Sequence, residues 1–270
     1  MQKEFMAFVR APLKVFSPED YFSLFWNVIT PIMIVYDTFF SPLQAAFFME
    51  DRSAWTTSAI VSPIFFSFDI LINFRMAFYN QGVLVINSSQ IIKHYLRGGF
   101  IEDSFSVLTD IISVICQDSP LWFVKIVSII RLIKLWTIIT RSEDFLIMSR
   151  VLNALLKMIK LWGSIIIVAH WLACAFYTVA HIEENMGIGP TWVEQNRLED
   201  SHVTATYIAA FYWSITTMVT VGYGDIVPGT SAERVYTVVA MIISSALFGY
   251  SLNTVGDIIR EMNREKDQRR

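Results

Sequence analysis

The chain has 270 residues, of which 54% are hydrophobic, 14% aromatic and only 17% charged. So few charges, with a mean hydropathy of +0.48, exclude an ordinary soluble domain, and a net charge of −3 does not suggest a nucleic-acid-binding protein. Residues 1–14 are a mixed amphipathic stretch and not a cleavable signal peptide, so internal segments must enter the membrane. Cys116 and Cys174 lie in apolar runs without disulfide or metal-ligand spacing, and we assign both to packing.

Six apolar segments have about the length of a bilayer-spanning helix, roughly 20 residues. They are predicted at 21–40, 55–79, 100–115, 121–140, 152–181 and 232–259. Between the last two lies 206–218, which at about 1.5 Å per residue covers only ~20 Å and is therefore expected to enter the membrane and return. The predicted fold class is all-α and transmembrane, with six spanning helices plus a re-entrant pore helix and loop.

Lysine and arginine gather in alternate loops, which sets the orientation of the chain by the positive-inside rule. The richer side carries Lys3, Arg10, Lys14, Arg75, Lys93, Arg97, Arg141, Arg150, Lys157, Arg260, Arg264, Lys266, Arg269 and Arg270. The other side carries only Arg52, Arg197 and Arg234. Both termini are therefore expected in the cytoplasm of a multi-pass protein, which we assign to the plasma membrane. The loop 182–203 is then extracellular and acidic, either simply solvated or enriching cations at its surface.

The fourth segment carries a polar residue at every third position. These residues are Lys125, Ser128, Arg131, Lys134, Thr137 and Thr140. Basic side chains inside a span are costly and usually face protein or water, and this stripe suits a helix that slides past fixed acids. Candidate acids are Asp69, Asp103 and Asp110. The alternative is a static set of salt bridges that holds a helix bundle together.

The pentapeptide from Thr220 to Gly224 follows the short helix and precedes the last span. Its residues are Thr220, Val221, Gly222, Tyr223 and Gly224. This sequence is identical to the selectivity filter of potassium channels, where backbone carbonyls replace the hydration shell of the ion. The glycines permit backbone angles that turn successive carbonyls inward, and the threonine hydroxyl adds one more oxygen.

The neighbours of this pentapeptide have expected roles as well. Tyr223 is expected to point away from the ions and to brace the strand against aromatics such as Trp213, and Asp225 to lie at the outer mouth. Because a ring of carbonyls needs several copies and the known arrangement uses four, we expect a homotetramer or a heterotetramer. Potassium ions in the filter and the lipid bilayer are the expected partners, without any cofactor or nucleic acid.

Four stretches resemble the six-span potassium channels of the cyclic-nucleotide-binding-domain superfamily, namely the ether-à-go-go, hyperpolarisation-activated and plant inward-rectifier types. They are SFDILINFRMAF, HYLRGGFIEDSFSVLTDI, AHWLACAFY and VGYGDIVPGTSAERVY. Together they distribute the resemblance over residues 16–259. The fourth segment departs from most relatives by having fewer basic residues, and Asn253 stands where many members have glycine.

The resemblance implies a division of the chain into regions. These are a cytoplasmic segment 1–16, a voltage-sensor-like four-helix domain 17–140, a linker 141–150, a pore domain 151–260 and the start of a cytoplasmic linker 261–270. The short linker implies that each sensor packs beside the pore of its own subunit, without domain swapping. A nucleotide-binding domain is expected to follow in the family, and the chain is expected to be truncated before it.

Gating at the cytoplasmic end of the sixth span is also implied by the resemblance. There Gly249 and Gly256 would bend or pack closely, and Val255 and Ile259 would narrow the inner pore, with ordinary helix packing as the alternative. The sequence thus predicts a non-enzymatic, potassium-selective channel with passive conduction and weak or shifted voltage dependence. The alternatives are a channel controlled by cyclic nucleotides with a non-moving sensor, and a potassium transporter.

Overall fold

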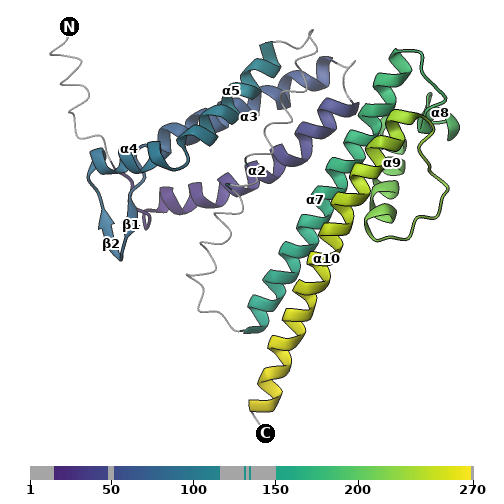
Figure 1. Cartoon of the computed structure of the whole chain (residues 1–270). Coiled ribbons are helices and arrows are strands. Elements are labelled where there is room, and N and C mark those ends of the chain that lie inside the picture. Colours follow the sequence, from purple (N-terminus) through teal and green to yellow (C-terminus); the bar gives the residue numbers. More distant parts are fainter. Residues whose placement is uncertain (1–14, 48–51, 116–130, 132–133, 135–149, 269–270) are drawn as a thin grey trace. The chain divides into compact units, whose positions relative to one another are not determined.

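The computed structural model describes residues 15–47, 52–115, 131, 134 and 150–268, which are mostly helical (Figure 1). They form two compact units: residues up to 41 belong to the first together with 52–115, 131 and 134, and residues 42–47 belong to the second together with 150–268. The expected helical fold is confirmed in its main feature, since the described residues are mostly helical, with one short β-hairpin among them. Most of the predicted fourth segment, including Lys125, and nearly all of the predicted linker lie outside the described residues.

Three helices make up most of the first unit: α2 (Tyr21–Phe47, up to residue 41), α3 (Arg52–Asn73) and α5 (Phe100–Ile115). One buried side chain from each, Ile34, Phe66 and Val107, forms a shared apolar cluster. Helix α5 has the bounds expected from its apolar pattern. Helix α2, in contrast, continues seven residues past its predicted end at 40, because Leu43, Ala46 and Phe47 in its last turns pack in an apolar cluster around Cys174.

The prediction that the second span runs to Tyr79 is wrong. Helix α3 ends at Asn73, and the chain then forms a hairpin of β1 (Phe78–Asn80) and β2 (Val83–Val85). Gln81 and Gly82 join the strands with φ of 50° and 80°, as a two-residue hairpin turn requires. The backbone N–H of Ala77 donates a hydrogen bond to the Phe16 carbonyl at 2.9 Å. This pairing with the N-terminal segment also opposes a continuation of α3 as a helix.

Helix α4 (Ser88–Arg97) connects this hairpin to α5. Asn87 caps its start, because the Asn87 side chain accepts a hydrogen bond from the backbone N–H of Ser89 at 3.0 Å. Only Gly98 and Gly99 separate its end from α5. The hairpin and α4 therefore form a compact connection between the ends of α3 and α5.

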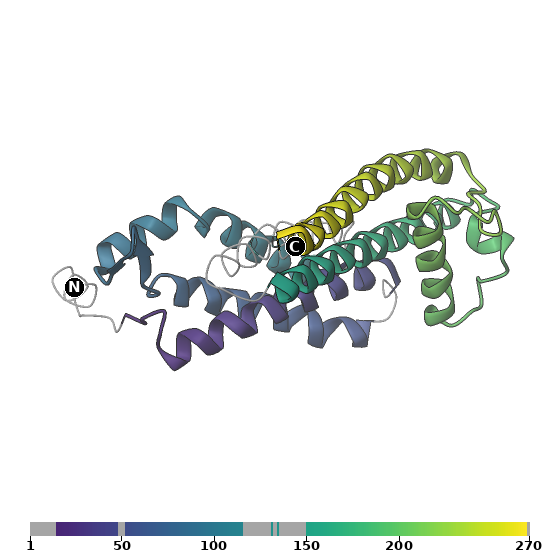
Figure 2. The ribbon, with the colours of Figure 1, turned by 90° about the horizontal axis from the view of Figure 1, so that it is seen from below.

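The second unit is built on two long antiparallel helices, α7 (Arg150–Asn185) and α10 (Ser231–Gln268), as Figures 1 and 2 both show. The short helices α8 (Trp192–Gln195) and α9 (Val203–Met218) pack near the end where α7 finishes and α10 begins. Phe176 of α7 lies in the core, with its ring 3.8 Å from Trp213 and 4.9 Å from Trp192. The last turns of α2 join this unit, where Phe47 stacks on Tyr177 at 4.0 Å.

Three helices in the described part of the chain are long and apolar enough to cross a membrane, at Tyr21–Phe47, Ala154–Asn185 and Ser231–Arg260. A shorter apolar helix covers Ile60–Asn73. Helix α9 has 16 residues and spans about 24 Å at ~1.5 Å per residue, less than the hydrocarbon thickness of roughly 30 Å. The protein therefore belongs in a membrane, and α9, like the described part of α5, is shorter than the hydrocarbon thickness.

Candidate functional site

The segment that follows α9 is attached to this helix through its backbone N–H groups. The N–H of Val221 donates to the Thr216 carbonyl at 2.8 Å, and that of Gly222 donates to the same oxygen at 3.2 Å. The N–H of Thr220 donates to the Thr217 carbonyl at 3.1 Å. The last carbonyls of α9, which lack partners within the helix, are thereby satisfied by the strand that leaves it.

The backbone of this segment alternates in handedness. Thr220, Gly222 and Gly224 have φ of 59°, 55° and 78°, whereas Val221 and Tyr223 between them are not in the positive-φ region. A positive φ is easy for glycine but strained for a β-branched threonine, and such strain is typical of functional sites. Alternating backbone handedness turns successive carbonyl groups toward one side of a strand. The residues from Val219 to Asp225 are exposed, so the described chain leaves this side open.

The side chains of Tyr223 and Asp225 are both linked to α9. Tyr223 stacks on Tyr212 with ring centroids 6.3 Å apart and nearly parallel planes, and the Tyr212 hydroxyl hydrogen-bonds the Asp225 carboxylate. Within this chain an aromatic side chain of α9 does stack on Tyr223, as expected, but it is Tyr212 and not the expected example, Trp213. Trp213 is one position further along the helix and faces the core, where it stacks on Phe176.

A buried carboxylate holds the loop that follows the segment 220–224. Glu233, at 0% exposure, accepts hydrogen bonds from the backbone N–H groups of Trp192 at 3.1 Å, Gly229 at 2.6 Å and Thr230 at 3.3 Å. The Thr230 hydroxyl in turn accepts from the Glu233 N–H at 3.2 Å, which completes a capping box at the start of α10. The Thr-Ser-Ala-Glu sequence carries the signal of this cap, whereas the link to Trp192 depends on the tertiary fold.

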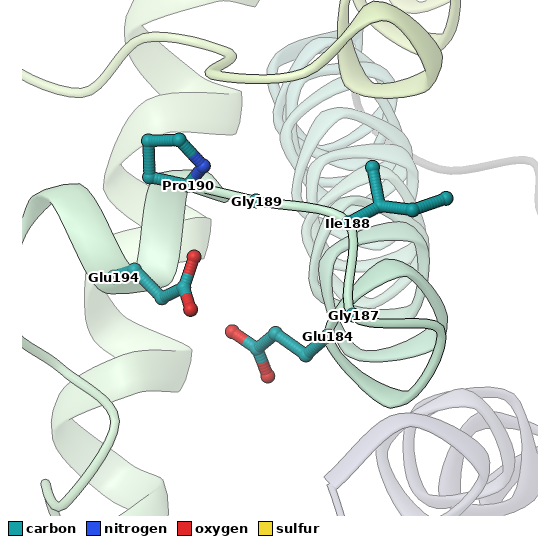
Figure 3. Close-up of a pocket in the computed structure, with 6 residues that line it drawn as sticks. All are labelled: Glu184, Gly187, Ile188, Gly189, Pro190 and Glu194. Atoms are coloured by element: carbon teal, nitrogen blue, oxygen red, sulfur yellow. The ribbon is translucent and has the colours of Figure 1, made fainter.

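Two carboxylates, Glu184 at the end of α7 and Glu194 in α8, line one open cavity of about 540 Å³ (Figure 3). Both are engaged by Thr191: its hydroxyl donates to Glu184 at 2.9 Å and its N–H donates to Glu194 at 2.8 Å. Within the described residues, no group of three or more acidic, histidine or cysteine side chains is arranged to hold a metal ion. Glu194 therefore completes the capping box of α8, whereas Glu184 anchors the Thr191 hydroxyl to α7.

The first unit contains a second site, in which charges are buried. Arg131 is 3% exposed and pairs through its two Nη atoms with Asp37 and with Asp110, the latter at 2.6 Å. Its guanidinium carbon lies 3.8 Å from the centre of the Phe66 ring. A buried cation of this kind is tolerated because opposite charges and an aromatic face surround it.

The Lys134 ammonium forms a second group of ion pairs in this site. Its Nζ atom pairs with Asp69 and lies 2.9 Å from Asp103. Because Asp103 and Asp110 are seven residues apart on α5, they stand about two turns apart and serve successive basic residues. Arg131 and Lys134, which are three residues apart in the sequence, thus each face a separate pair of acids.

The three acids expected to face the fourth segment, Asp69, Asp103 and Asp110, are all brought together with its basic residues. Asp37 and Phe66 were missed. Asp37 is an ionisable residue inside the predicted first span, near its end, and such residues by default face a partner, so its signal was present in the sequence. Phe66 carries no such signal, since one aromatic among several in α3 gives no indication of its contact with a cation.

The four residues expected at the inner gate all lie on α10, which is one continuous helix. Gly249 is exposed, with no described atom within 4 Å of the position that a Cβ would take, whereas Gly256 and Val255 are half-buried. Ile259 is exposed. Their roles at a gate stay predictions.

Comparison with known proteins gives a match to the model of the family described as ion transport protein over residues 23–267. The chain is also 24% identical to the mouse voltage-gated inwardly rectifying potassium channel KCNH7, and 22% identical to the human channel KCNH6 of the same description. It is 24% identical to KCNH2 of the rat. Each alignment covers 89% of this chain but only 22% to 28% of the relative, so the chain spans about a quarter of their length.

Proposed function

This chain belongs to the ion transport protein family, and on that premise we propose that it conducts potassium ions passively through a pore made by four copies. Family membership also confirms that the chain is not an enzyme. The relatives named above are described as potassium channels, which agrees with the pentapeptide from Thr220 to Gly224.

The observation that carries the proposal is the alternation in the sign of φ along the segment, with positive values at Thr220, Gly222 and Gly224. The first backbone N–H groups of the same segment donate hydrogen bonds to carbonyls of α9. With the first N–H groups of the strand directed toward α9, the carbonyls are free to face away from it. Oxygens in this arrangement, and the Thr220 hydroxyl, would replace the water around a dehydrated potassium ion. One strand supplies only a fraction of the oxygens that an ion needs, which is why the proposal requires several copies.

The proposal of a tetramer is supported by the apolar surface of α10. Val235, Val238 and Ile242 are exposed by 67%, 56% and 65%, on the helix that follows the filter. A side of this helix that faces other copies would cover part of that surface. We propose the symmetric homotetramer as the simplest closed assembly, without domain swapping, and with Gly249, Val255, Gly256 and Ile259 at its cytoplasmic gate.

We propose a weak or shifted voltage dependence for the same channel. The support is the buried charge site, in which Arg131 pairs with Asp37 and Asp110, and Lys134 pairs with Asp69 and Asp103. Because Asp103 and Asp110 follow one another along α5, successive basic residues meet successive acids. Moving one charge through 100 mV changes its energy by about 2.3 kcal/mol. A static bundle is the alternative, and control by cyclic nucleotides remains a proposal for a longer protein, because the relatives extend well beyond this chain.

The test is to reconstitute the purified chain into planar bilayers with potassium on one side and sodium on the other. We expect the reversal potential to follow the potassium gradient, and native mass spectrometry to give a mass of four chains. Equal permeability to sodium and potassium would contradict the filter, and a monomer that conducts would contradict the shared pore. A voltage series on the same bilayers then separates a moving sensor from a static bundle.

A further inference from the structure

We propose that helix α4 binds anionic lipid headgroups of the cytoplasmic leaflet, and that this binding is transmitted to the Lys134 ion pair through Tyr95. The binding surface consists of Ile92, Lys93, Leu96 and Arg97, and is called the α4 surface below. The binding step depends only on the chain lying in a membrane, whereas its electrical effect rests on the proposed function.

The position of α4 in the first unit places it at the boundary of the bilayer. It lies beside the hairpin at the ends of α3 and α5, and only Gly98 and Gly99 separate it from α5 (Figure 1). A ten-residue helix is only about 15 Å long, so its connections to two apolar helices keep it near the membrane surface. The proposal places α4 along that surface.

The side chains of α4 divide into an inner and an outer face. Ile91 is 1% exposed and Tyr95 is half-buried, so this face packs on the unit. Ile92 and Leu96 are 38% and 43% exposed, although both are apolar and one turn apart. Lys93 and Arg97 follow them around the helix, each about 100° further on, and both are exposed.

This combination fits lipid better than water or a folded protein partner. An apolar pair beside a cationic pair is the pattern of a helix whose apolar side enters the interface while its charges meet the headgroups. Among the residues that the structure describes, neither Lys93 nor Arg97 forms an ion pair, so both charges are available to an anionic partner. The negative cytoplasmic leaflet attracts such juxtamembrane cations. Two further exposed apolar residues, Val83 and Ile86, extend the apolar side onto the hairpin.

Tyr95 connects the inner face of α4 to the charge site. Its hydroxyl donates to Asp103 Oδ2 at 2.7 Å, and Asp103 is the acid that lies 2.9 Å from Lys134 Nζ. The Tyr95 ring is held edge-on against Phe74 at 4.9 Å. Any displacement of α4 on the membrane therefore changes how strongly Asp103 attracts Lys134, because the hydrogen bond of Tyr95 competes for the same carboxylate.

Binding is tested by native mass spectrometry of the whole purified protein titrated with phosphatidylglycerol or phosphatidylcholine. We expect the double variant Lys93→Gln/Arg97→Gln to need roughly tenfold more phosphatidylglycerol for half occupancy, with no change for phosphatidylcholine. The matched control is Arg197→Gln/Arg234→Gln, which removes two exposed charges elsewhere. Equal phosphatidylglycerol retention by the double variant and the control would overturn the site.

Transmission is tested in bilayers of phosphatidylcholine with and without phosphatidylglycerol. We expect the midpoint of the conductance–voltage curve to shift with phosphatidylglycerol in the unaltered protein, and this shift to shrink at least twofold in Tyr95→Phe. That variant keeps the ring and should retain phosphatidylglycerol normally. A full shift in Tyr95→Phe would overturn the relay. Absence of potassium current in every lipid would instead contradict the proposed function, while the mass-spectrometric result would still decide the binding.

Discussion

The charge site of the first unit and the proposed filter of the second, residues 220–224, differ in how far one chain completes them. Arg131 and Lys134 each pair with two acids of their own chain, so every basic group of this site has its partners without any other copy. The filter backbone is held from behind by α9, whereas its open side faces nothing that the described chain supplies.

Substitutions in the charge site are therefore expected to change the stability of the chain, whereas substitutions in the segment 220–224 are expected to change conduction. Removing a basic side chain from the charge site leaves its two acids facing each other in a buried place, which destabilises the chain itself. Altering the open side of the filter removes few contacts within the chain, and the effect is expected only where copies meet around an ion. The predictions below use this contrast, in order of expected effect.

The largest effect is expected from Gly222→Ala, which should abolish selective potassium current. Gly222 has φ of 55°, where an alanine side chain is strained, so the strand should leave its conformation and misdirect its carbonyls. Bilayer recording measures the current, and thermal unfolding should change by no more than about 1 kcal/mol. Gly163→Ala, on α7 with open space around its Cβ position, is the matched control that should conduct normally.

Arg131→Gln should destabilise the first unit by about 3–5 kcal/mol, because Asp37 and Asp110 then face each other without the cation between them. Thermal unfolding of the purified protein, followed by tryptophan fluorescence, measures the loss. The exposed Arg75 is the matched site, and Arg75→Gln should change stability little. The conductance–voltage curve of Arg131→Gln should also shift or flatten, and an unchanged curve would favour the static bundle.

Glu233→Gln should cost about 1.5–3 kcal/mol, since hydrogen bonds to a charged acceptor are replaced by those of a neutral amide. The amide NH₂ group also meets a backbone N–H where the carboxylate accepted one. The outer loop should loosen, so we expect faster loss of current during sustained opening than in the unaltered protein. An equally stable variant with unchanged current decay would show that the link from Trp192 to Gly229 does not support the filter.

The sequence was sufficient for features set by local pattern and insufficient for those set by packing. The length of the apolar run 100–115 predicted a helix, and the alternating glycines in 220–224 predicted an extended segment with alternating backbone angles. The basic residues at every third position of the fourth segment led to the search for acids that found Asp69, Asp103 and Asp110. Trp213 was misassigned because two adjacent aromatics on one helix differ by about 100° in direction, and sequence alone does not say which faces the core. The end of α3 was misjudged because Phe78 and Tyr79 are apolar enough for a span but pair in a hairpin instead.

The smallest effect, from Gly249→Ala, shows whether α10 is complete in one chain or shaped by its copies. Within the described chain a methyl group at this position meets no atom within 4 Å, and alanine in a helix is favoured over glycine by roughly 0.5–1 kcal/mol. A slightly higher unfolding temperature with an intact tetramer would mean that Gly249 faces open space in the assembly too. If the tetramer instead dissociates at a lower detergent concentration or the channel no longer closes, another copy must approach this glycine closely. In that case the inner helix, like the filter, is completed only by its neighbours.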